Sequence, residues 1–167
     1  MEKDIKIKDM RMLVTPYPIF IDKNATTDDV AKTLIVNPGL KTVYVVDNEL
    51  KLLGGITLKK LIRQEFSDLL PNNFEYFGAL DFIGKTTAYD MMEPLVYVKD
   101  DDTLKTAFIK MYENELDELP VVNSNLKLIG NIDLLELLTI LIEKKEQQSG
   151  KKFLCVTSNR PFYKRFE

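Results

Sequence analysis

Two short segments of the chain combine residue types that can bind a small molecule at the start of a helix. The first reads Gly55-Ile56-Thr57 and has Lys60 three positions later; the second reads Gly130-Asn131-Ile132-Asp133 and has Glu136 three positions later. A glycine lets the backbone approach a ligand closely, and the free N–H groups at a helix start favour an anion such as phosphate. The first segment adds a hydroxyl and a cation to this arrangement, whereas the second adds two carboxylates.

Residue types needed for catalysis are scarce. The 167-residue chain has no histidine and a single cysteine, so the commonest general base and the commonest metal ligand are missing. The acidic run Asp100–Asp102 is compatible with a metal ion, but it precedes Thr103 at a predicted helix start, where acids complement the helix dipole, and we favour that interpretation. We predict no catalytic residue, no metal site and no enzymatic activity.

The sequence contains an internal repeat. Residues 50–62 align without gaps on residues 126–138, and seven of these thirteen pairs are identical, where about one match is expected by chance. The offset of 76 residues holds back to Val45-Val46-Asp47 and becomes 77 further upstream. A tandem duplication of a unit of about sixty residues explains this pattern.

Each unit predicts the order strand–helix–strand–strand–helix, which makes an α+β fold with pseudo-twofold repeats. We assign residues 1–65 to the first repeat, 88–146 to the second and 147–167 to a C-terminal extension. The intervening 66–87 segment is aromatic, and we expect a short helix near 74–82. The predicted strands and second helices span 18–21, 42–46, 52–56, 95–98, 119–122, 128–132, 58–70 and 134–145. Thr26 with Asp29 predicts a capping box at the first helix.

The duplicated motifs resemble the CBS (cystathionine-β-synthase-type) domain family, and the two repeats together are similar to a CBS pair, or Bateman module. The resemblance covers about residues 7–145 and is carried by ordered pieces in both copies. These are Asp9-Met10, Val43-Tyr-Val-Val-Asp47 and Leu52-Leu-Gly-Gly-Ile-Thr57, matched by Asp90-Met-Met-Glu-Pro94, Leu119-Pro-Val-Val-Asn123 and Leu128-Ile-Gly-Asn-Ile-Asp133. It implies two repeats packed through their sheets, two clefts, and regulation by adenosine-containing ligands such as AMP, ADP, ATP or S-adenosylmethionine.

The resemblance also implies the ligand-binding residues. They belong to the predicted first strand of each repeat, to the middle strand or to the two helix-start segments: Ile19, Tyr44, Gly55, Ile56, Thr57, Lys60, Leu95, Val96, Pro120, Asn131, Ile132, Asp133 and Glu136. Lys60 departs from the family pattern because it cannot accept a hydrogen bond from ribose. Asp133 places a carboxylate where phosphate would lie, so we expect the second cleft to prefer an uncharged or cationic adenosyl compound.

Structural interpretations remain open beside these functional ones. Thr57 and Asp133 are also favourable helix caps, with or without a ligand contact. Tyr44 either stacks on a base or fills the cleft. For Lys59 and Lys60 we favour a solvated helix face over an anion-binding role. Both clefts of an adaptor protein could have lost their ligands, and this is our alternative function.

The last predicted helix suggests a homodimer. Seven of the ten positions 133–142 are aliphatic, more than one buried stripe requires, so we expect the second helices of the repeats to contact another subunit. The inter-repeat segment 74–82 is the alternative cover. Output would then pass to an effector protein of unknown identity.

The net charge and the hydropathy of the chain limit the other kinds of partner that it can bind. The net charge is −3 at pH 7, which argues against broad nucleic-acid binding. From Glu143 onward, however, seven basic residues oppose three acidic ones and alternate with aromatics. We favour packing of this tail on the module over contact with nucleic acid or a partner. Cys155 is expected to be a small buried hydrophobe. No apolar run reaches the roughly 18–20 residues of a membrane span, and we expect a cytoplasmic protein.

Overall fold

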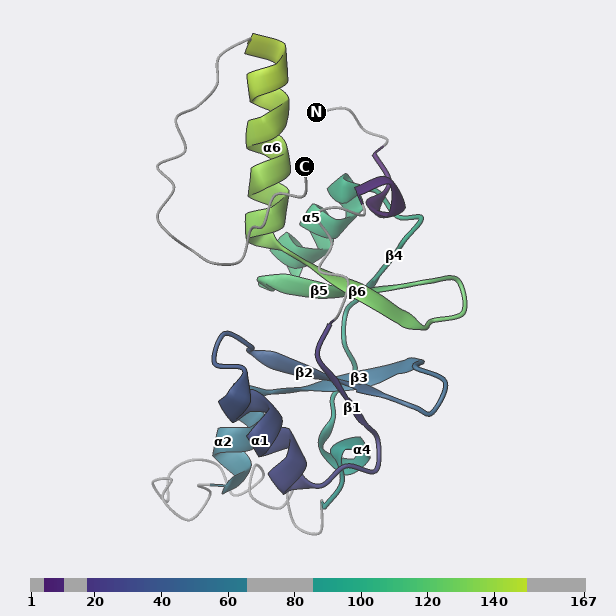
Figure 1. Cartoon of the computed structure of the whole chain (residues 1–167), viewed down its shortest axis with the longest axis vertical. Helices are drawn as coiled ribbons and strands as arrows, with labels where there is room; N and C mark the ends of the chain where they lie inside the picture. The colour runs from purple at the N-terminus through teal and green to yellow at the C-terminus, as the bar shows by residue number, and fades with distance from the viewer. Residues whose placement is uncertain (1–4, 11–17, 66–85, 150–167) are drawn as a thin grey trace.

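Two three-stranded sheets face each other across the centre of the molecule, and the helices cover their outer sides (Figure 1). The computed structural model describes residues 5–10, 18–65 and 86–149. The predicted helix near 74–82, the C-terminal extension and Cys155 lie outside these residues. The described elements make the α+β arrangement of two repeats that the sequence predicts.

The two repeats have the same elements in the same order. The first comprises β1 (Phe20–Asp22), α1 (Thr27–Val36), β2 (Thr42–Val46), β3 (Leu52–Thr57) and α2 (Leu58–Glu65). The second comprises β4 (Val98–Lys99), α5 (Leu104–Glu113), β5 (Glu118–Val122), β6 (Leu128–Asp133) and α6 (Leu134–Ser149). In each sheet the middle strand pairs in parallel with the strand before it and antiparallel with the strand after it.

Successive side chains of the middle strand β2 belong to two different hydrophobic clusters. In β2, Val43 and Val45 are fully buried in a cluster with residues of α1 and α2. Tyr44 and Val46 belong to a different cluster, with Leu128 of the other sheet. Successive side chains of a strand point to opposite faces, so one face of each sheet meets its own helices and the other meets the opposite repeat.

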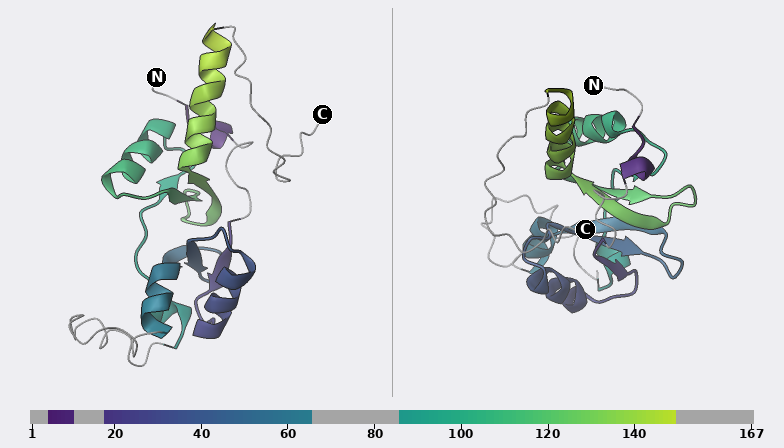
Figure 2. Two further views of the ribbon diagram at one scale, coloured as in Figure 1. Left: turned by 90° about the vertical axis from the view of Figure 1, so that its left-hand side faces the viewer. Right: turned by 45° about the horizontal axis from the view of Figure 1, so that its top comes forward.

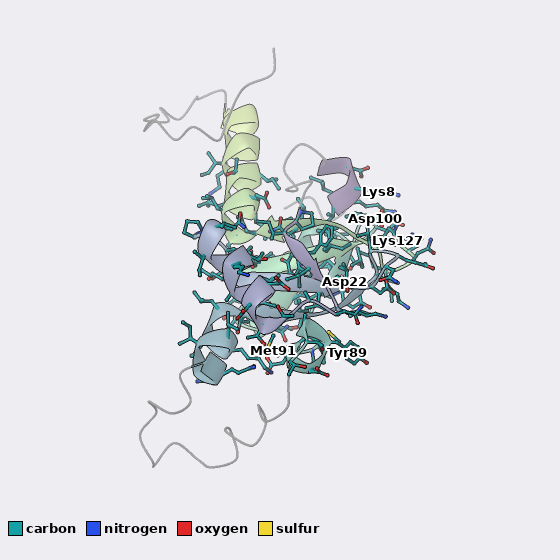
Figure 3. The ribbon with its side chains drawn as sticks, turned by 60° about the horizontal axis from the view of Figure 1, so that its bottom comes forward. Lys8, Asp22, Tyr89, Met91, Asp100 and Lys127 are labelled. Atoms are coloured by element: carbon teal, nitrogen blue, oxygen red, sulfur yellow. The ribbon has the colours of Figure 1, made fainter. Side chains whose placement is uncertain are left out.

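The two repeats exchange their leading segments. Residues 5–10, which contain the 3-10 helix η1 (Ile7–Met10), dock on the second repeat, while α4 (Ala88–Met91) docks on the first. Figure 3 shows Lys8 beside Asp100 at one docking site, and the Lys8 N–H donates to the Asp100 carbonyl at 2.8 Å. Met91 lies at the other and is fully buried in the first core. The two cores therefore include residues from outside the sequence ranges predicted for their own repeats.

A local twofold axis relates the halves. The Leu52 N–H donates to the Leu126 carbonyl at 3.0 Å, and the Leu128 N–H donates to the Leu50 carbonyl at 2.9 Å. Replacing each residue of one bond by its equivalent in the other copy, 76 positions later or earlier, gives the other bond. Leu50 and Leu126 also share a left-handed conformation, with φ of 63° and 62°. The cross-axis hydrogen bonds hold both strained turns in place.

The outermost strands are shorter than predicted. β1 begins at Phe20 rather than residue 18, and β4 covers only Val98–Lys99 rather than 95–98. The chain before β4 is engaged elsewhere, because Glu93 pairs with Gly55 of the first sheet. The predicted capping box is confirmed, since Thr26 and Asp29 exchange side-chain to backbone hydrogen bonds at the start of α1.

Candidate functional site

The start of α2 is the first candidate binding element. The Thr57 hydroxyl accepts the Lys60 N–H at 3.1 Å, so Thr57 caps this helix. The Lys60 ammonium forms an ion pair with Glu93, and its side chain is only 12% exposed. The predicted anion-binding cation is thus already neutralised by a carboxylate from the segment before β4. This pairing is not apparent in the sequence, because 33 residues separate the partners.

The segment before β4 lies directly on β3. Gly55 and Glu93 exchange two backbone hydrogen bonds, of 3.0 and 2.9 Å. A Cβ at Gly55 would lie 2.5 Å from Leu95 Cδ1, and one at Gly54 would lie 2.5 Å from the Glu93 carbonyl oxygen. Glycine is required at Gly54, where the neighbouring atom belongs to the backbone, whereas a side chain at Gly55 would displace the end of the Leu95 side chain. We call Gly55, Thr57, Lys60, Glu93 and Leu95 the first-copy site; the protein's own chain covers it.

The start of α6 is built differently. Asp133 Oδ1 accepts the Glu136 N–H at 2.7 Å, and Glu136 Oε2 accepts the Asp133 N–H at 2.9 Å. These reciprocal bonds form a capping box, in which each carboxylate satisfies a backbone donor at the helix start. Both predicted ligand contacts therefore have a structural role at the start of α6.

Tyr44 reaches from the first sheet toward this second element. The residue is 2% exposed and packs in the inter-sheet cluster with Val46 and Leu128. Its hydroxyl is buried without a hydrogen-bond partner among the described residues, as is Asn131 Oδ1. Burial and the nearby Glu118 carboxylate raise the pKa of Tyr44, while the Asn131 amide lowers it. Tyr44 therefore remains a neutral phenol that faces groups of the other repeat.

Glu118 is a candidate site residue that the sequence analysis missed. It opens β5 directly opposite Asp133 of β6, and its Oε1 is buried without a partner among the described residues. Burial is the main cause that raises the pKa of Glu118, and the Asp133 charge raises it further. Its place beside Asp133 in the predicted hairpin, at the position of Thr42 in the first copy, was the available signal. We call Tyr44, Glu118, Asn131, Asp133 and Glu136 the second-copy site.

The remaining predicted site residues either pack in a hydrophobic cluster or make backbone contacts. Ile56 and Ile132 are buried in the two helix-facing cores, so their side chains point away from the inter-sheet face. Pro120 is buried opposite Asn131. The Ile19 carbonyl accepts the Tyr44 N–H at 3.4 Å. Val96 packs against the second core, whereas Leu95 packs in the inter-sheet cluster.

A pocket of about 420 Å³ lies beside the segment before β4. Its lining residues are Leu95, Val96, Tyr97, Lys99, Asp102 and Lys110. The Lys110 ammonium donates to the Tyr97 carbonyl at 2.8 Å and lies 3.5 Å from Asp102, so Lys110, one of the two lysines that line this pocket, is already paired. Asp101 likewise pairs with Lys6 and Lys8. The acidic run Asp100–Asp102 therefore directs two of its carboxylates at lysines.

Comparison with known proteins agrees with this geometry. The sequence matches the CBS domain family over residues 7–66 and 87–143, one match for each repeat. The chain belongs to the CBS domain family. As a CBS pair it has the paired sheets and exchanged segments described above. No curated protein matches the sequence.

Solved CBS structures share the fold. CBSX2 in complex with AMP is 22% identical with a TM-score of 0.66, over 84% of this chain and 98% of that one. The putative acetoin utilization protein AcuB from Vibrio cholerae is 26% identical with a TM-score of 0.63, over 90% and 99%. The CBS domain pair of protein MJ0100, in complex with 5′-methylthioadenosine and S-adenosyl-L-methionine, is 20% identical with a TM-score of 0.62, over 84% and 98%.

Two further observations on the structure concern membranes and metal ions. Within the described ranges, none of the helices combines the length and the hydropathy needed to span a bilayer. In the same ranges, no three cysteine or carboxylate side chains gather in a group that could hold a metal ion.

Proposed function

We propose that this CBS pair is a regulatory module that binds an adenosine-containing small molecule at the second-copy site. The observation that carries the proposal is the junction between the repeats, where the buried Tyr44 hydroxyl of the first sheet faces Asn131 and Glu118 of the second. A ligand held there contacts both repeats and so links its occupancy to their relative position. The AMP-bound and S-adenosylmethionine-bound CBS structures support this ligand class.

The two sites differ in what remains for a ligand. At the first-copy site Glu93 neutralises Lys60 and Leu95 lies on Gly55. At the second-copy site three polar atoms lack a partner among the described residues. We therefore expect ligand binding at the second-copy site, and one ligand per chain.

We propose no catalytic activity for this chain, so a change in ligand occupancy has to be passed on to another protein. We propose a homodimer formed through α2 and α6, with an effector protein that reads its geometry. Exposed apolar side chains on these helices support the dimer: Leu58, Ile62, Leu134, Leu135, Leu138 and Ile142. The four helices α1, α2, α5 and α6 face one side of the molecule (Figure 2).

A thermal-shift experiment tests the proposed function. The full chain is heated with adenosine, AMP, ATP, S-adenosylmethionine or 5′-methylthioadenosine. A ligand at one hundred times its dissociation constant stabilises by ~2.7 kcal/mol, or about 5–10 °C for a chain of this size. Guanosine and cytidine serve as controls. The absence of a shift with every adenosyl compound would reject the proposal.

An adaptor without a ligand is the second candidate function. The covering of the first-copy site by the protein's own chain favours it, because a CBS pair can use such contacts for rigidity alone. An adaptor would give no thermal shift with the adenosyl panel yet would still form the dimer. The same experiment therefore separates the two functions.

A further inference from the structure

Three polar atoms lie buried between the two sheets without hydrogen-bond partners among the described residues. They are the Tyr44 hydroxyl, Glu118 Oε1 and Asn131 Oδ1. Tyr44 comes from β2 of the first repeat, whereas Glu118 and Asn131 come from β5 and β6 of the second. The three groups lie close together, because the Asn131 side chain lowers the pKa of both Tyr44 and Glu118.

Such atoms are costly in a folded protein. A buried donor or acceptor without a partner has lost its hydration and gained no hydrogen bond in return, so it destabilises the folded state. Two of the three atoms are pure acceptors, and the phenol can donate or accept. A group that supplies hydrogen-bond donors would satisfy the cluster best. Amines and hydroxyls have this property, a sulfonium offers positive charge but no N–H or O–H donor of its own, and a phosphate at neutral pH offers mainly further acceptors.

The charges around the cluster point the same way. Asp133 lies opposite Glu118 across the β5–β6 pair, and Glu136 follows one turn into α6. The nearest cation acting on Glu118 is Lys41, but its ammonium is 2.6 Å from the Asp117 carboxylate. The local field is therefore negative, and a second anion would be repelled.

The equivalent positions of the first copy are not acidic. Glu118, Asn131, Asp133 and Glu136 correspond to Thr42, Gly55, Thr57 and Lys60 through the 76-residue offset. Only the second copy places carboxylates at these positions. The negative charge at Glu118 is therefore a property of the second copy that the first copy does not share.

We propose that Glu118, together with Tyr44 and Asn131, determines the charge of the adenosyl ligand at the second-copy site: it favours an adenosyl cation such as a sulfonium and rejects adenosine phosphates. The inference rests on the proposed function, because it specifies the ligand of the same site. Glu118 acts as a specificity-determining residue and not as a catalytic one.

Calorimetric titration of the full chain tests this assignment. S-adenosylmethionine, adenosine and AMP are titrated into the wild type and into Glu118→Gln, which has nearly the same shape without the charge. We expect the wild type to bind S-adenosylmethionine more tightly than AMP, and the ratio of the two affinities to fall by about tenfold or more in the variant. Adenosine, which is neutral, should change little.

Two further variants complete the design. Glu118→Thr introduces the residue of the first copy and should reproduce the lowered ratio even if the glutamine variant is poorly folded. Glu113→Gln removes an exposed carboxylate on α5 and should leave the ratio unchanged.

The outcomes separate the two levels of the proposal. Adenosine binding with equal affinities for AMP and S-adenosylmethionine, or an unchanged ratio in both Glu118 variants, would overturn the charge assignment and leave the proposed function in place. Binding of no adenosyl compound would overturn both, and the cluster would then be a site of bound water only.

Discussion

Tyr44 combines a structural and a functional demand in one side chain. Its ring fills the space between the sheets, with 2% of the residue exposed, while its hydroxyl has no partner among the described residues. The ring contributes to stability through apolar burial, whereas the hydroxyl detracts from it. A residue chosen for packing alone would be phenylalanine, so the hydroxyl is the part that calls for a functional explanation.

The variant Tyr44→Phe separates these two demands. Removal of an unpartnered buried hydroxyl should leave the free energy of unfolding unchanged or raise it by up to about 1–3 kcal/mol. Affinity for adenosine should fall in the same variant, because the ligand loses a hydrogen-bond partner. Urea denaturation and calorimetry measure the two quantities. A marked loss of stability would show that the hydroxyl already has a strong partner in the free protein.

Glu118 predicts a specific dependence of stability on pH. Its folded pKa is raised above the ordinary value of 4.5 by burial and by Asp133. The folded state therefore holds the proton more tightly than the unfolded state, and the free energy of unfolding falls as the pH rises from 4.5 through the folded pKa. Glu118→Gln removes this loss.

Denaturation curves at several pH values check the prediction. We expect Glu118→Gln to be more stable than the wild type at pH 7, with the difference shrinking toward zero below pH 4.5. The control Glu113→Gln should show no such trend. A variant that is less stable than the wild type at pH 7 would mean that the Glu118 charge is favourable in the folded protein.

At the scale of elements, the exchanged segments tie the repeats together. Ile7 is 1% exposed in the core of the second repeat, although it precedes the first. Ala88 and Met91 of α4 occupy the corresponding place in the first core. The hydrogen bonds agree in detail: Ile7 N–H donates to Asp102, and Ala88 N–H donates to Ala25. Each hydrophobic core therefore includes residues from the segment that precedes the other repeat in the sequence.

The substitution Ile7→Ala should therefore destabilise the second repeat. Loss of a fully buried isoleucine side chain typically costs about 2–5 kcal/mol. Urea denaturation of the variant measures the change. The control Lys8→Ala removes only a solvent-exposed ion pair with Asp101 and should have little effect. Equal stability of Ile7→Ala and the wild type would contradict the docking of residues 5–10.

The sequence was sufficient for the four strands of the two hairpins and insufficient for the outer strands, for η1 and α4, and for the tertiary pairing at the sites. Repetition, alternation and turn residues predict β2, β3, β5 and β6 to within a residue at each end. Local hydrogen bonds explain the success at Thr26 and Asp29, which lie three positions apart. The ion pair of Lys60 with Glu93 and the approach of Tyr44 to Glu118 join different repeats. Such contacts depend on how the sheets pack, which no local pattern encodes.

At the scale of the whole molecule, the described helices carry exposed apolar side chains on one side (Figure 2). Helix α6 buries Leu137 and Ile140 in or near its own core but exposes Leu135 and Leu138 at 58% and 52%. Exposed apolar residues also occur on α1 and α5, on the same side of the molecule (Figure 2). Apolar residues exposed on one side of a protein are typical of protein–protein contacts when they form a contiguous surface. The face agrees with the homodimer that we propose.

The substitution Leu138→Glu tests the proposed dimer. A charge placed in an apolar interface would lose its hydration without a partner, so we expect the variant to be a monomer at micromolar concentration. Light scattering measures the mass of the variant and of the wild type. Tyr89→Glu, on the exposed surface of α4, is the control and should remain dimeric. A wild-type mass of one chain would reject this interface.

The stoichiometry of adenosine binding tests the central claim most directly. Calorimetric titration of adenosine into the full chain should give one site per chain. That site should be lost in Asn131→Leu, which keeps the volume of the side chain without its polar atoms, and retained in Lys60→Ala. Absence of binding, or a site that is lost in Lys60→Ala and kept in Asn131→Leu, would contradict the assignment of the ligand to the second-copy site.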